Sequence, residues 1–182
     1  MNDRLVLRMA VREDAHACAN ILKESADDGL VARSDEVDPV QVARQIESAR
    51  AASNSLFVVA VVPSGDGPFE NAHEGDDDVV IGLLLLEGAP LMRLHDVARL
   101  TMAVTPAHRH AGVGRALVVY ALECADASGL IRKVELLVRA NNQPAIALYK
   151  ALGFVEEGRL RARLRLEDGT FLDDVCMARF KP

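Results

Sequence analysis

Hydrophobic and polar positions along this chain follow two periods, one typical of strands and one typical of helices. Alternation or short β-branched runs predict strands at Arg4 to Met9, Leu56 to Val62, Val79 to Leu86, Val97 to Val104, Lys133 to Val138, Arg159 to Leu166 and Phe171 to Phe180. Recurrence at i, i+3, i+4 and i+7 predicts helices at Val11 to Ala26, at Pro39 to Ala51, after the glycines that follow Val104, and at Gln143 to Leu152. Strands and helices are therefore interspersed along the chain.

Each predicted helix carries one apolar face. In chain order these faces are Ala15, Cys18, Ala19, Leu22 and Ala26, then Val42, Ile46 and Ala49, then Leu117, Tyr120, Ala121 and Cys124, and finally Ala145, Leu148, Tyr149 and Leu152. The last helix has clear end signals, with Pro144 near its first position, Gly153 just past its last, and Asn141 or Asn142 as its cap. By spacing alone, Tyr149 is a core aromatic.

One stretch, VTPAHRHAGVGRAL from Val104 to Leu117, joins a strand to a helix through a turn. Pro106 ends the strand, and Gly112 and Gly114 place no side chain between the backbone and a group at the helix N-terminus. The free N–H groups and positive dipole end of a helix start favour an anion such as phosphate. A tight turn without a ligand is the alternative reading of the same pattern.

Composition and charge narrow the classes of protein. The 182 residues, 50% hydrophobic and 26% charged, predict one globular domain over residues 1–182. The net charge of −6 gives no sign of the basic surface that nucleic-acid binding needs, and it suits an amine-bearing partner. An apolar run long enough for a membrane span and the apolar core of a signal peptide are both missing from the sequence, which predicts a cytoplasmic protein. Three widely spaced cysteines, Cys18, Cys124 and Cys176, predict buried thiols rather than disulfides or a zinc site.

Two segments between elements are rich in acidic and turn residues. Ser34 to Asp38 reads as a linker, and Pro63 to Asp78 reads as a long exposed hairpin loop. His73 in this loop, with the neighbouring acidic residues, could be imagined as a metal ligand. A solvated acidic loop is the commoner case, so no metal site is predicted.

Two separate motifs carry a resemblance to a known family. Arg109-x-x-Gly112-x-Gly114 is followed downstream by Asn142 and by the run from Ala145 to Phe154 that contains Leu148-Tyr149 and Gly153-Phe154. In this order the motifs resemble the GNAT superfamily of N-acetyltransferases, and the likeness covers about residues 95 to 180. It implies an α/β (α+β) GNAT fold, with a mixed, mostly antiparallel sheet of about seven strands, splayed between the fourth and fifth and flanked by about four helices.

The resemblance implies acetyl-CoA (CoA) as cofactor and direct transfer of its acetyl group to an amine. The residues it places at the cofactor are Met102, Val104, Arg109, His110, Ala111, Gly112, Val113, Gly114, Arg115, Asn142 and Tyr149. Val104 would offer its backbone N–H to the acetyl carbonyl, and Tyr149 would act as the general acid that protonates the leaving thiolate. The general base stays open among Glu87, His95, Asp96, Glu135 and water, with Glu87 and His95 taken as catalytic candidates.

The C-terminal third bears on the acceptor. The alternation from Arg159 to Arg165 puts arginines on one strand face, which is either a solvated edge or a clamp for carboxylate or phosphate. The ending, together with Arg93-x-His95, resembles bacterial N-acyltransferases of small amino acids and, more distantly, ribosomal-protein N-terminal acetyltransferases. We therefore expect a small-molecule primary amine as acceptor, with a peptide N-terminus as the runner-up; many such relatives pair as homodimers.

Two other classes compete with this interpretation. A Rossmann dehydrogenase would also place Gly-x-Gly after a strand, but Leu117 occupies the third glycine position and the motif lies deep in the chain. A non-catalytic acyl-CoA sensor would keep the cofactor turn without needing Tyr149. Turnover of acetyl-CoA with an amine separates the sensor from an enzyme.

Overall fold

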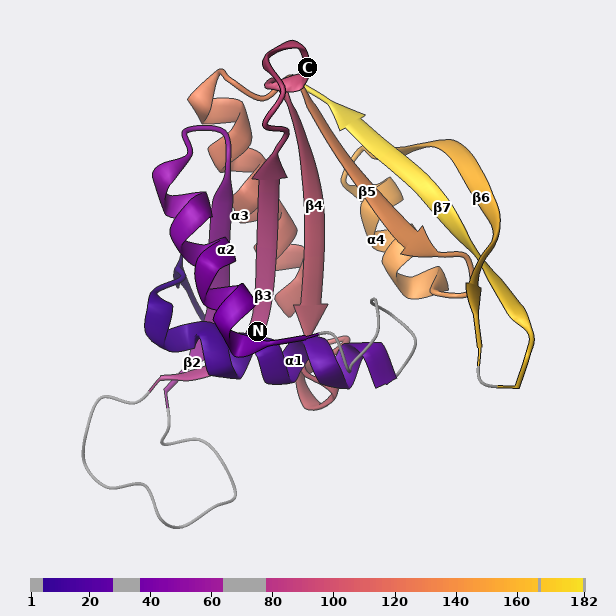
Figure 1. Cartoon of the computed structure of the whole chain (residues 1–182), viewed down its shortest axis with the longest axis horizontal. Helices are drawn as coiled ribbons and strands as arrows, with labels where there is room; N and C mark the ends of the chain where they lie inside the picture. The colour runs from indigo at the N-terminus through magenta and orange to yellow at the C-terminus, as the bar shows by residue number, and fades with distance from the viewer. Residues whose placement is uncertain (1–4, 28–36, 64–77, 167, 182) are drawn as a thin grey trace.

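The computed structural model of the chain describes residues 5–27, 37–63, 78–166 and 168–181 (Figure 1). Its strands are β1 (Val6–Met9), β2 (Leu56–Val62), β3 (Val79–Gly88), β4 (Val97–Val104), β5 (Lys133–Arg139), β6 (Val155–Arg165) and β7 (Phe171–Phe180). Its α-helices are α1 (Ala15–Asp27), α2 (Pro39–Ala51), α3 (Val113–Ser128) and α4 (Gln143–Ala151). Within these residues, no helix has the length and apolar content to span a membrane.

The strands form one sheet in the order β1-β2-β3-β4-β5-β7-β6. Every neighbouring pair is antiparallel except β4 and β5, which are parallel. A parallel pair needs a crossover connection, and α3 supplies it. In Figure 1, α1 and α2 lie on the near face of the sheet and α3 and α4 on the far face. The predicted mixed, mostly antiparallel α/β fold is confirmed.

The β4–β5 pairing is short. Only Val97, Ala98 and Arg99 of β4 have register partners on β5, at Lys133, Val134 and Glu135. Beyond these residues the two strands separate, and Figure 1 shows the gap widening toward the carboxyl end of β4. The predicted splay between the fourth and fifth strands is therefore present, and it leaves the facing backbone edges of β4 and β5 without a neighbouring strand.

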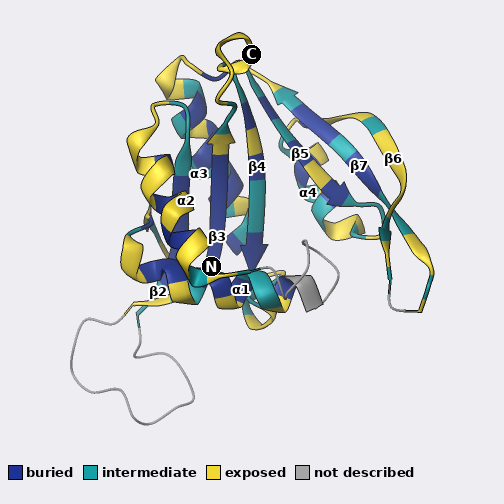
Figure 2. Ribbon diagram, in the orientation of Figure 1, coloured by how far each residue is buried: buried dark blue, intermediate teal, exposed yellow. Residues whose placement is uncertain are grey.

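Two apolar clusters cover the sheet. One contains Leu100, Leu117, Val134 and Tyr149 and joins the sheet to α3 and α4. The other contains Cys18, Ile46 and Leu83 and joins the sheet to α1 and α2. Figure 2 shows the buried residues along β3, β4, β5 and β7 and the exposed ones on the outer sides of the helices.

A partly buried ion pair fixes the start of α1. The Asp14 carboxylate accepts hydrogen bonds from Arg8 Nη1 at 2.8 Å and Nη2 at 2.9 Å, and from the Val11 N–H at 2.8 Å. These three bonds link β1 to the 3-10 turn η1 (Arg12–Asp14) that precedes the helix. The pKa of Asp14 is lowered, because the hydrogen bonds from Arg8 and Val11 outweigh the opposing effect of burial.

Several details differ from the sequence expectations. The buried face of α3 is Val113, Leu117, Val118, Ala121, Leu122 and Ala125, so Tyr120 and Cys124 lie at its margin rather than inward. In α4 the buried residues are Ile146 and Tyr149, while Ala145, Leu148 and Leu152 are partly exposed. Of the three cysteines, all free, only Cys18 is buried.

The hairpin of β6 and β7 also departs from strict alternation. Asp168 Oδ1 accepts from the Thr170 N–H at 2.9 Å in the turn between the two strands, and β6 is an edge strand, as one of the two alternatives for its arginine face expected. The ladder is regular at Leu160↔Asp174 and at Leu164↔Leu172, but residues 161–163 face Asp173 alone. This bulge breaks the continuous arginine face that alternation predicts. His73 and most of the Pro63 to Asp78 loop lie outside the described residues, as does most of the Ser34 to Asp38 linker.

Candidate active site

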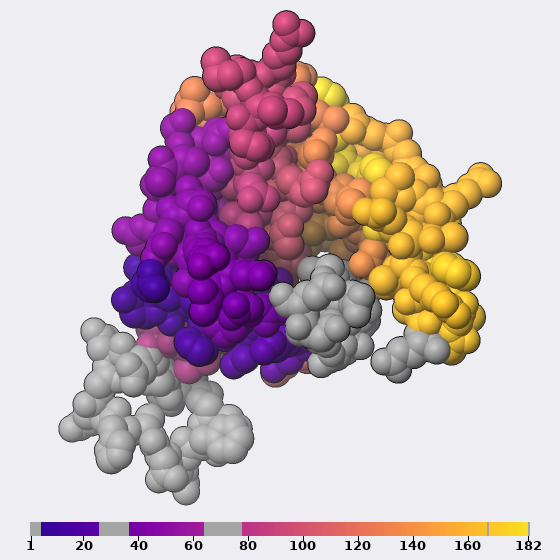
Figure 3. Space-filling view, in the orientation of Figure 1, coloured from indigo at the N-terminus to yellow at the C-terminus, as the bar shows by residue number. Residues whose placement is uncertain are grey.

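A cavity of about 830 Å³ occupies the gap between β4 and β5. Figure 3 shows the surface hollowed there, between the pink β3–β4 region and the orange β5–β6 region. Nine of the predicted cofactor residues line it: Met102, Val104, Arg109, His110, Gly112, Gly114, Arg115, Asn142 and Tyr149. Ala111 and Val113 do not, because Ala111 is exposed beside the turn and Val113 is buried in the core. The two sequence motifs thus meet at one cavity.

The turn after β4 gives the cavity its backbone donors. Gly112 is the N-cap of α3 and adopts φ 88°, a left-handed conformation that favours glycine. A Cβ built on Gly112 would meet no atom within 4 Å, so the space in front of it is open. A Cβ on Gly114 would lie 3.2 Å from Met102 Cε, so Gly114 lets α3 approach β4 closely. An open glycine turn at the start of a 16-residue helix suits an anion.

The last residue of β4 directs its backbone into the cavity. Thr105 donates its N–H to Ile81 O at 2.9 Å on the β3 side. Successive residues of a strand direct their N–H and C=O groups to alternate sides, so those of Val104 point the other way, toward β5. Arg109 confirms this direction, because its Nε donates to Val104 O at 3.0 Å from the turn. The Val104 N–H is therefore available to a carbonyl oxygen between the splayed strands.

Tyr149 reaches the cavity from α4. Asn142 caps this helix by accepting from the Ala145 N–H at 3.2 Å, so Asn142 both lines the cavity and orients the helix. Tyr149 is only 6% exposed, and its ring packs against Phe154 with 5.5 Å between the centroids. Burial raises the pKa of the Tyr149 phenol to about 12, so the hydroxyl keeps its proton at neutral pH. The side chain is both a core aromatic and part of the cavity lining.

The cavity continues through the sheet to the face covered by α1. Its wall there includes Ser25 of α1, Arg139 at the end of β5 and Asp174 of β7, none of which the sequence analysis singled out. Arg139 and Asp174 are register partners that form a hydrogen-bonded ion pair with side-chain exposures of 12% and 4%. A weak sequence signal existed, since Asp173 and Asp174 interrupt an otherwise apolar strand. Their partner could not be named without the register.

Three of the four candidate bases line a different cavity. Glu87, His95 and Glu135 border a space of about 1110 Å³ beside the carboxyl end of α2 and the start of β5. His95 Nδ1 lies 2.6 Å from Met92 O. The fourth, Asp96, accepts from Arg132 Nε at 2.6 Å, which lowers the pKa of its carboxyl.

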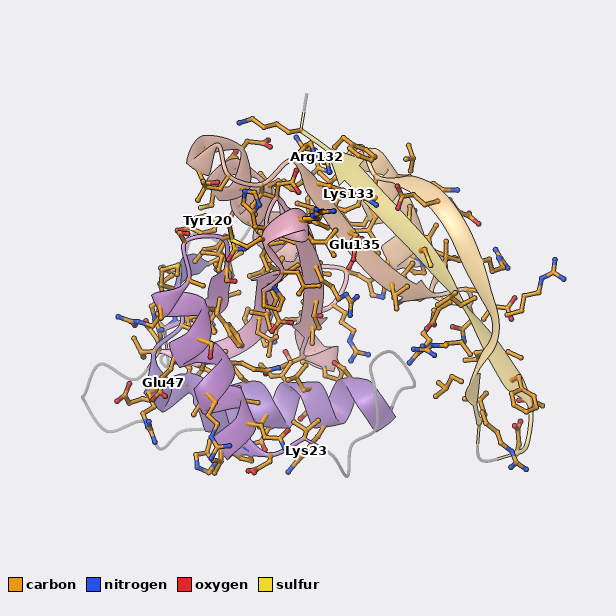
Figure 4. All side chains as sticks on the ribbon, turned by 45° about the horizontal axis from the view of Figure 1, so that its top comes forward. Lys23, Glu47, Tyr120, Arg132, Lys133 and Glu135 are labelled. Carbon is orange, nitrogen blue, oxygen red and sulfur yellow. The ribbon has the colours of Figure 1, made fainter. Side chains whose placement is uncertain are left out.

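Glu135 belongs to a charged cluster at the start of β5. Its carboxylate lies 3.7 Å from both Arg99 and Lys133, and Figure 4 shows Glu135 close to Lys133 and Arg132. Arg99 borders both cavities. Among the described residues that line the cavity with Tyr149, Asp174 is the one carboxylate, so the structure does not bring Glu87, His95, Asp96 or Glu135 to that cavity wall.

Comparison with known proteins identifies the family to which these residues belong. The model of the acetyltransferase (GNAT) family matches residues 63–154, about half of the chain, and includes the glycine turn and Tyr149. The chain belongs to the GNAT family. Acetyl-CoA is the cofactor of GNAT acetyltransferases. The open space at Gly112, the helix N-terminus and the neighbouring arginines fit the pyrophosphate of that cofactor.

Individual GNAT relatives differ in their acceptors. The chain is 32% identical over 105 residues to the L-amino acid N-acetyltransferase AaaT of Escherichia coli, covering 58% of this chain and 64% of that protein. It is 33% identical over 76 residues to the spermidine N(1)-acetyltransferase of Vibrio cholerae, covering 42% of this chain and 44% of that protein. The matches thus span less than two thirds of either relative.

A solved GNAT structure shares the whole fold. The phosphinothricin acetyltransferase from Sinorhizobium meliloti, in complex with acetyl-CoA, matches with a TM-score of 0.81 and 22% identity, covering 98% of this chain and 89% of that one. At this identity the likeness supports the fold alone.

Proposed function

We propose that this chain is an acetyl-CoA-dependent N-acetyltransferase that transfers acetyl directly to the primary amine of a small molecule, an amino acid or a close analogue. The observation that carries the proposal is the convergence on one cavity of three groups that the reaction needs. These are the Gly112 turn, the Val104 N–H and the Tyr149 hydroxyl.

Cofactor binding uses the α3 side of the cavity. The pyrophosphate binds here, because the backbone N–H groups at the start of α3 donate to its oxygens and the cationic side chains of Arg109 and Arg115 balance its charge. The backbone edge of β4 from Met102 to Val104, left unpaired by the splay, is free to hydrogen-bond the amides of the pantetheine arm. When bound, acetyl-CoA supplies the acetyl group as a thioester.

The residues of the chain supply charge stabilisation and a proton. The Val104 N–H donates to the carbonyl oxygen as negative charge develops on it during attack by the amine. Tyr149 holds its proton at neutral pH and transfers it from the hydroxyl to the departing sulfur. This assignment requires no covalent enzyme intermediate, and hence no Ser-His-Asp or Cys-His arrangement.

For the proton of the attacking amine we favour water. Glu87, His95 and Glu135 line the other cavity, and Asp96 is bound to Arg132. Asp174 lines the cavity with Tyr149 but is already bound to Arg139. Water, which the sequence left open beside these residues, can reach the gap between β4 and β5 and carry the proton to solvent.

Charge favours an amino acid over a polyamine as acceptor. Away from the glycine turn, the charged residues of the cavity wall are Arg99, Arg139 and Arg163 against Asp174. A polycation such as spermidine would meet an excess of positive charge there, whereas a carboxylate would be attracted. The likeness to the Escherichia coli amino-acid acetyltransferase supports the same choice.

The test is thiol release from acetyl-CoA in a screen of amino acids, polyamines, aminoglycosides and N-terminal peptides, with acetylated products confirmed by mass spectrometry. We expect amino acids or their analogues to be turned over. Acetyl-CoA binding without turnover of any amine would contradict the enzyme proposal and favour a sensor. Turnover of polyamines or aminoglycosides alone would contradict the acceptor class.

A further inference from the structure

The bulge in β6 has an unusual conformation at its centre. Ala162 adopts φ 48°, in the left-handed region that alanine rarely occupies. Its N–H donates to Asp173 Oδ1 at 2.8 Å, so a side chain of β7 holds the bulge in place. Bulges change the direction of the side chains beside them and are frequent next to active sites. A strained residue held by its neighbours marks a place where the fold fixes a side chain for a purpose.

The side chain that the bulge redirects is Arg163. It lines the cavity together with Leu164, whereas Arg161 and Arg165 of the same strand do not, although all three arginines are exposed. Without the bulge, strict alternation would direct Arg161, Arg163 and Arg165 to the same face. The bulge thus distinguishes one exposed arginine from the others of the strand and places it at the cavity wall.

Arg163 also differs from Arg139 and Arg99 of the cavity wall in its partners. Arg139 is bound to Asp174, and Arg99 lies 3.7 Å from Glu135. No described residue lies within ion-pair or hydrogen-bond distance of the Arg163 guanidinium. A guanidinium offers two parallel N–H donors that match a carboxylate, and one without a protein partner keeps both for a ligand.

The place of Arg163 in the sheet suggests which ligand it meets. Arg163 lies in the bulge between the Leu160↔Asp174 and Leu164↔Leu172 pairs, and it lines the cavity together with Asp174 and with Ser25 of α1. The glycine turn and Tyr149 reach the cavity from α3 and α4 on the other side. We infer that Arg163 binds the carboxylate of the acceptor and so selects α-amino acids over amines without a carboxylate. This inference rests on the proposed function.

The experiment compares acceptors that differ only in the carboxylate. Each amino acid that the wild-type protein acetylates is paired with the amine obtained by removing its carboxylate, and kcat/KM is measured for both. The variants are Arg163→Gln, Arg163→Lys and, as the matched control, Arg165→Gln from the exposed part of the same strand. The dissociation constant for CoA is measured for every variant.

We expect Arg163→Gln to lower kcat/KM for the amino acid by about 10- to 100-fold, mainly through KM, and to change the value for the matched amine by less than about twofold. Arg163→Lys should recover part of the loss, because it restores the charge without the two-pronged geometry. Arg165→Gln should behave as wild type.

Two results would overturn the inference while leaving the proposed function intact. One is an unchanged preference for the carboxylate in Arg163→Gln. The other is weaker CoA binding with equal losses for both acceptors, which would assign Arg163 to a cofactor phosphate. Failure of the wild-type protein to acetylate any amine would instead refute the proposed function, and the inference with it.

Discussion

Arg109 Nε donates a 3.0 Å hydrogen bond to the Val104 carbonyl and thereby ties the glycine turn to the last residue of β4. The bond fixes the turn beside the open edge of the strand, so the turn proposed to bind a phosphate keeps a constant position relative to the Val104 amide proposed to bind the acetyl carbonyl. Arg109 is therefore expected to act through geometry as well as charge.

The glycine turn can be tested by filling the space in front of Gly112. Because Gly112 has φ 88°, a β-branched residue would strain the backbone, whereas asparagine tolerates this region. Gly112→Asn should therefore fold and weaken CoA binding by at least about 10-fold, measured by calorimetry. Gly129→Asn is the matched control, since Gly129 has φ 67° and equally open space at the other end of α3. Equal CoA affinity in the two variants would show that the pyrophosphate does not bind at this turn.

The charged residues near the start of β4 provide a second test. Val97 and Val104 are seven residues apart, which in an extended strand is about 23 Å, so Glu87 and His95 lie at the far end of β4 from the cofactor turn. Loss of a general base lowers a rate by about 10²- to 10⁴-fold. We expect Glu87→Gln and Glu135→Gln each to lower kcat by less than about 10-fold. A loss of 100-fold or more in either variant, with its folding intact, would identify that carboxylate as the base.

Several elements of the fold could be predicted from sequence patterns alone. The predicted bounds of β2, β4, β7 and α2 coincide with the structure. The reason for α2 is local, because Asp38 accepts from the Val40 N–H at 2.9 Å and Pro39 follows at the first helical position. The glycine turn could also be predicted from the sequence, because its glycines are contiguous with the strand and the helix on either side of it.

The parts that could not be predicted depend on long-range pairing. Ser25 is a polar residue that α1 buries against the cavity, and its polar and charged neighbours Lys23 and Glu24 gave no sign of this. Arg139 and Asp174 are 35 residues apart and meet only through the β5–β7 register. The bulge at Ala162 reverses an alternation that is regular in the sequence. Glu87 and His95 were taken as catalytic candidates from their nearness in sequence to β4, although they adjoin its opposite end.

The Arg139–Asp174 pair should stabilise the cavity wall. Asp174→Ala would leave a nearly buried guanidinium unpaired, so we expect the free energy of unfolding to fall by about 3–5 kcal/mol, measured by urea denaturation. The double variant Arg139→Leu with Asp174→Leu removes both charges and should recover most of that loss. Asp174→Ala as stable as wild type would mean that the pair is open to water in solution.

The Arg8–Asp14 pair predicts a dependence of stability on pH. The pKa of Asp14 is lowered in the folded protein, so its contribution is fully present above the pKa of the unfolded chain, about 3.9, and is lost as pH falls through the lower folded value. Asp14→Asn should lower the free energy of unfolding by about 1–3 kcal/mol at neutral pH. The gap to wild type should shrink below about pH 4. A gap that stays constant down to pH 2 would show that Asp14 titrates normally.

Tyr149→Phe tests the assignment of the general acid. The substitution keeps the buried ring and its contact with Phe154 but removes the hydroxyl, and with it the proton held at neutral pH by a pKa of about 12. We expect kcat to fall by about 10- to 1000-fold while the dissociation constant for acetyl-CoA changes little. The measurement is single-turnover acetylation, so that chemistry rather than product release sets the rate.

A purely structural tyrosine would give a different outcome. Its loss would lower stability modestly and leave the single-turnover rate near that of wild type, because the phenyl ring still fills its place in the core. Tyr120→Phe, on the partly exposed side of α3, is the matched control, since it removes the other tyrosine hydroxyl of the chain far from the cavity lining. If the Tyr149→Phe and Tyr120→Phe variants both acetylate at the wild-type rate, the leaving sulfur takes its proton from water. Tyr149 then contributes only to packing in the core.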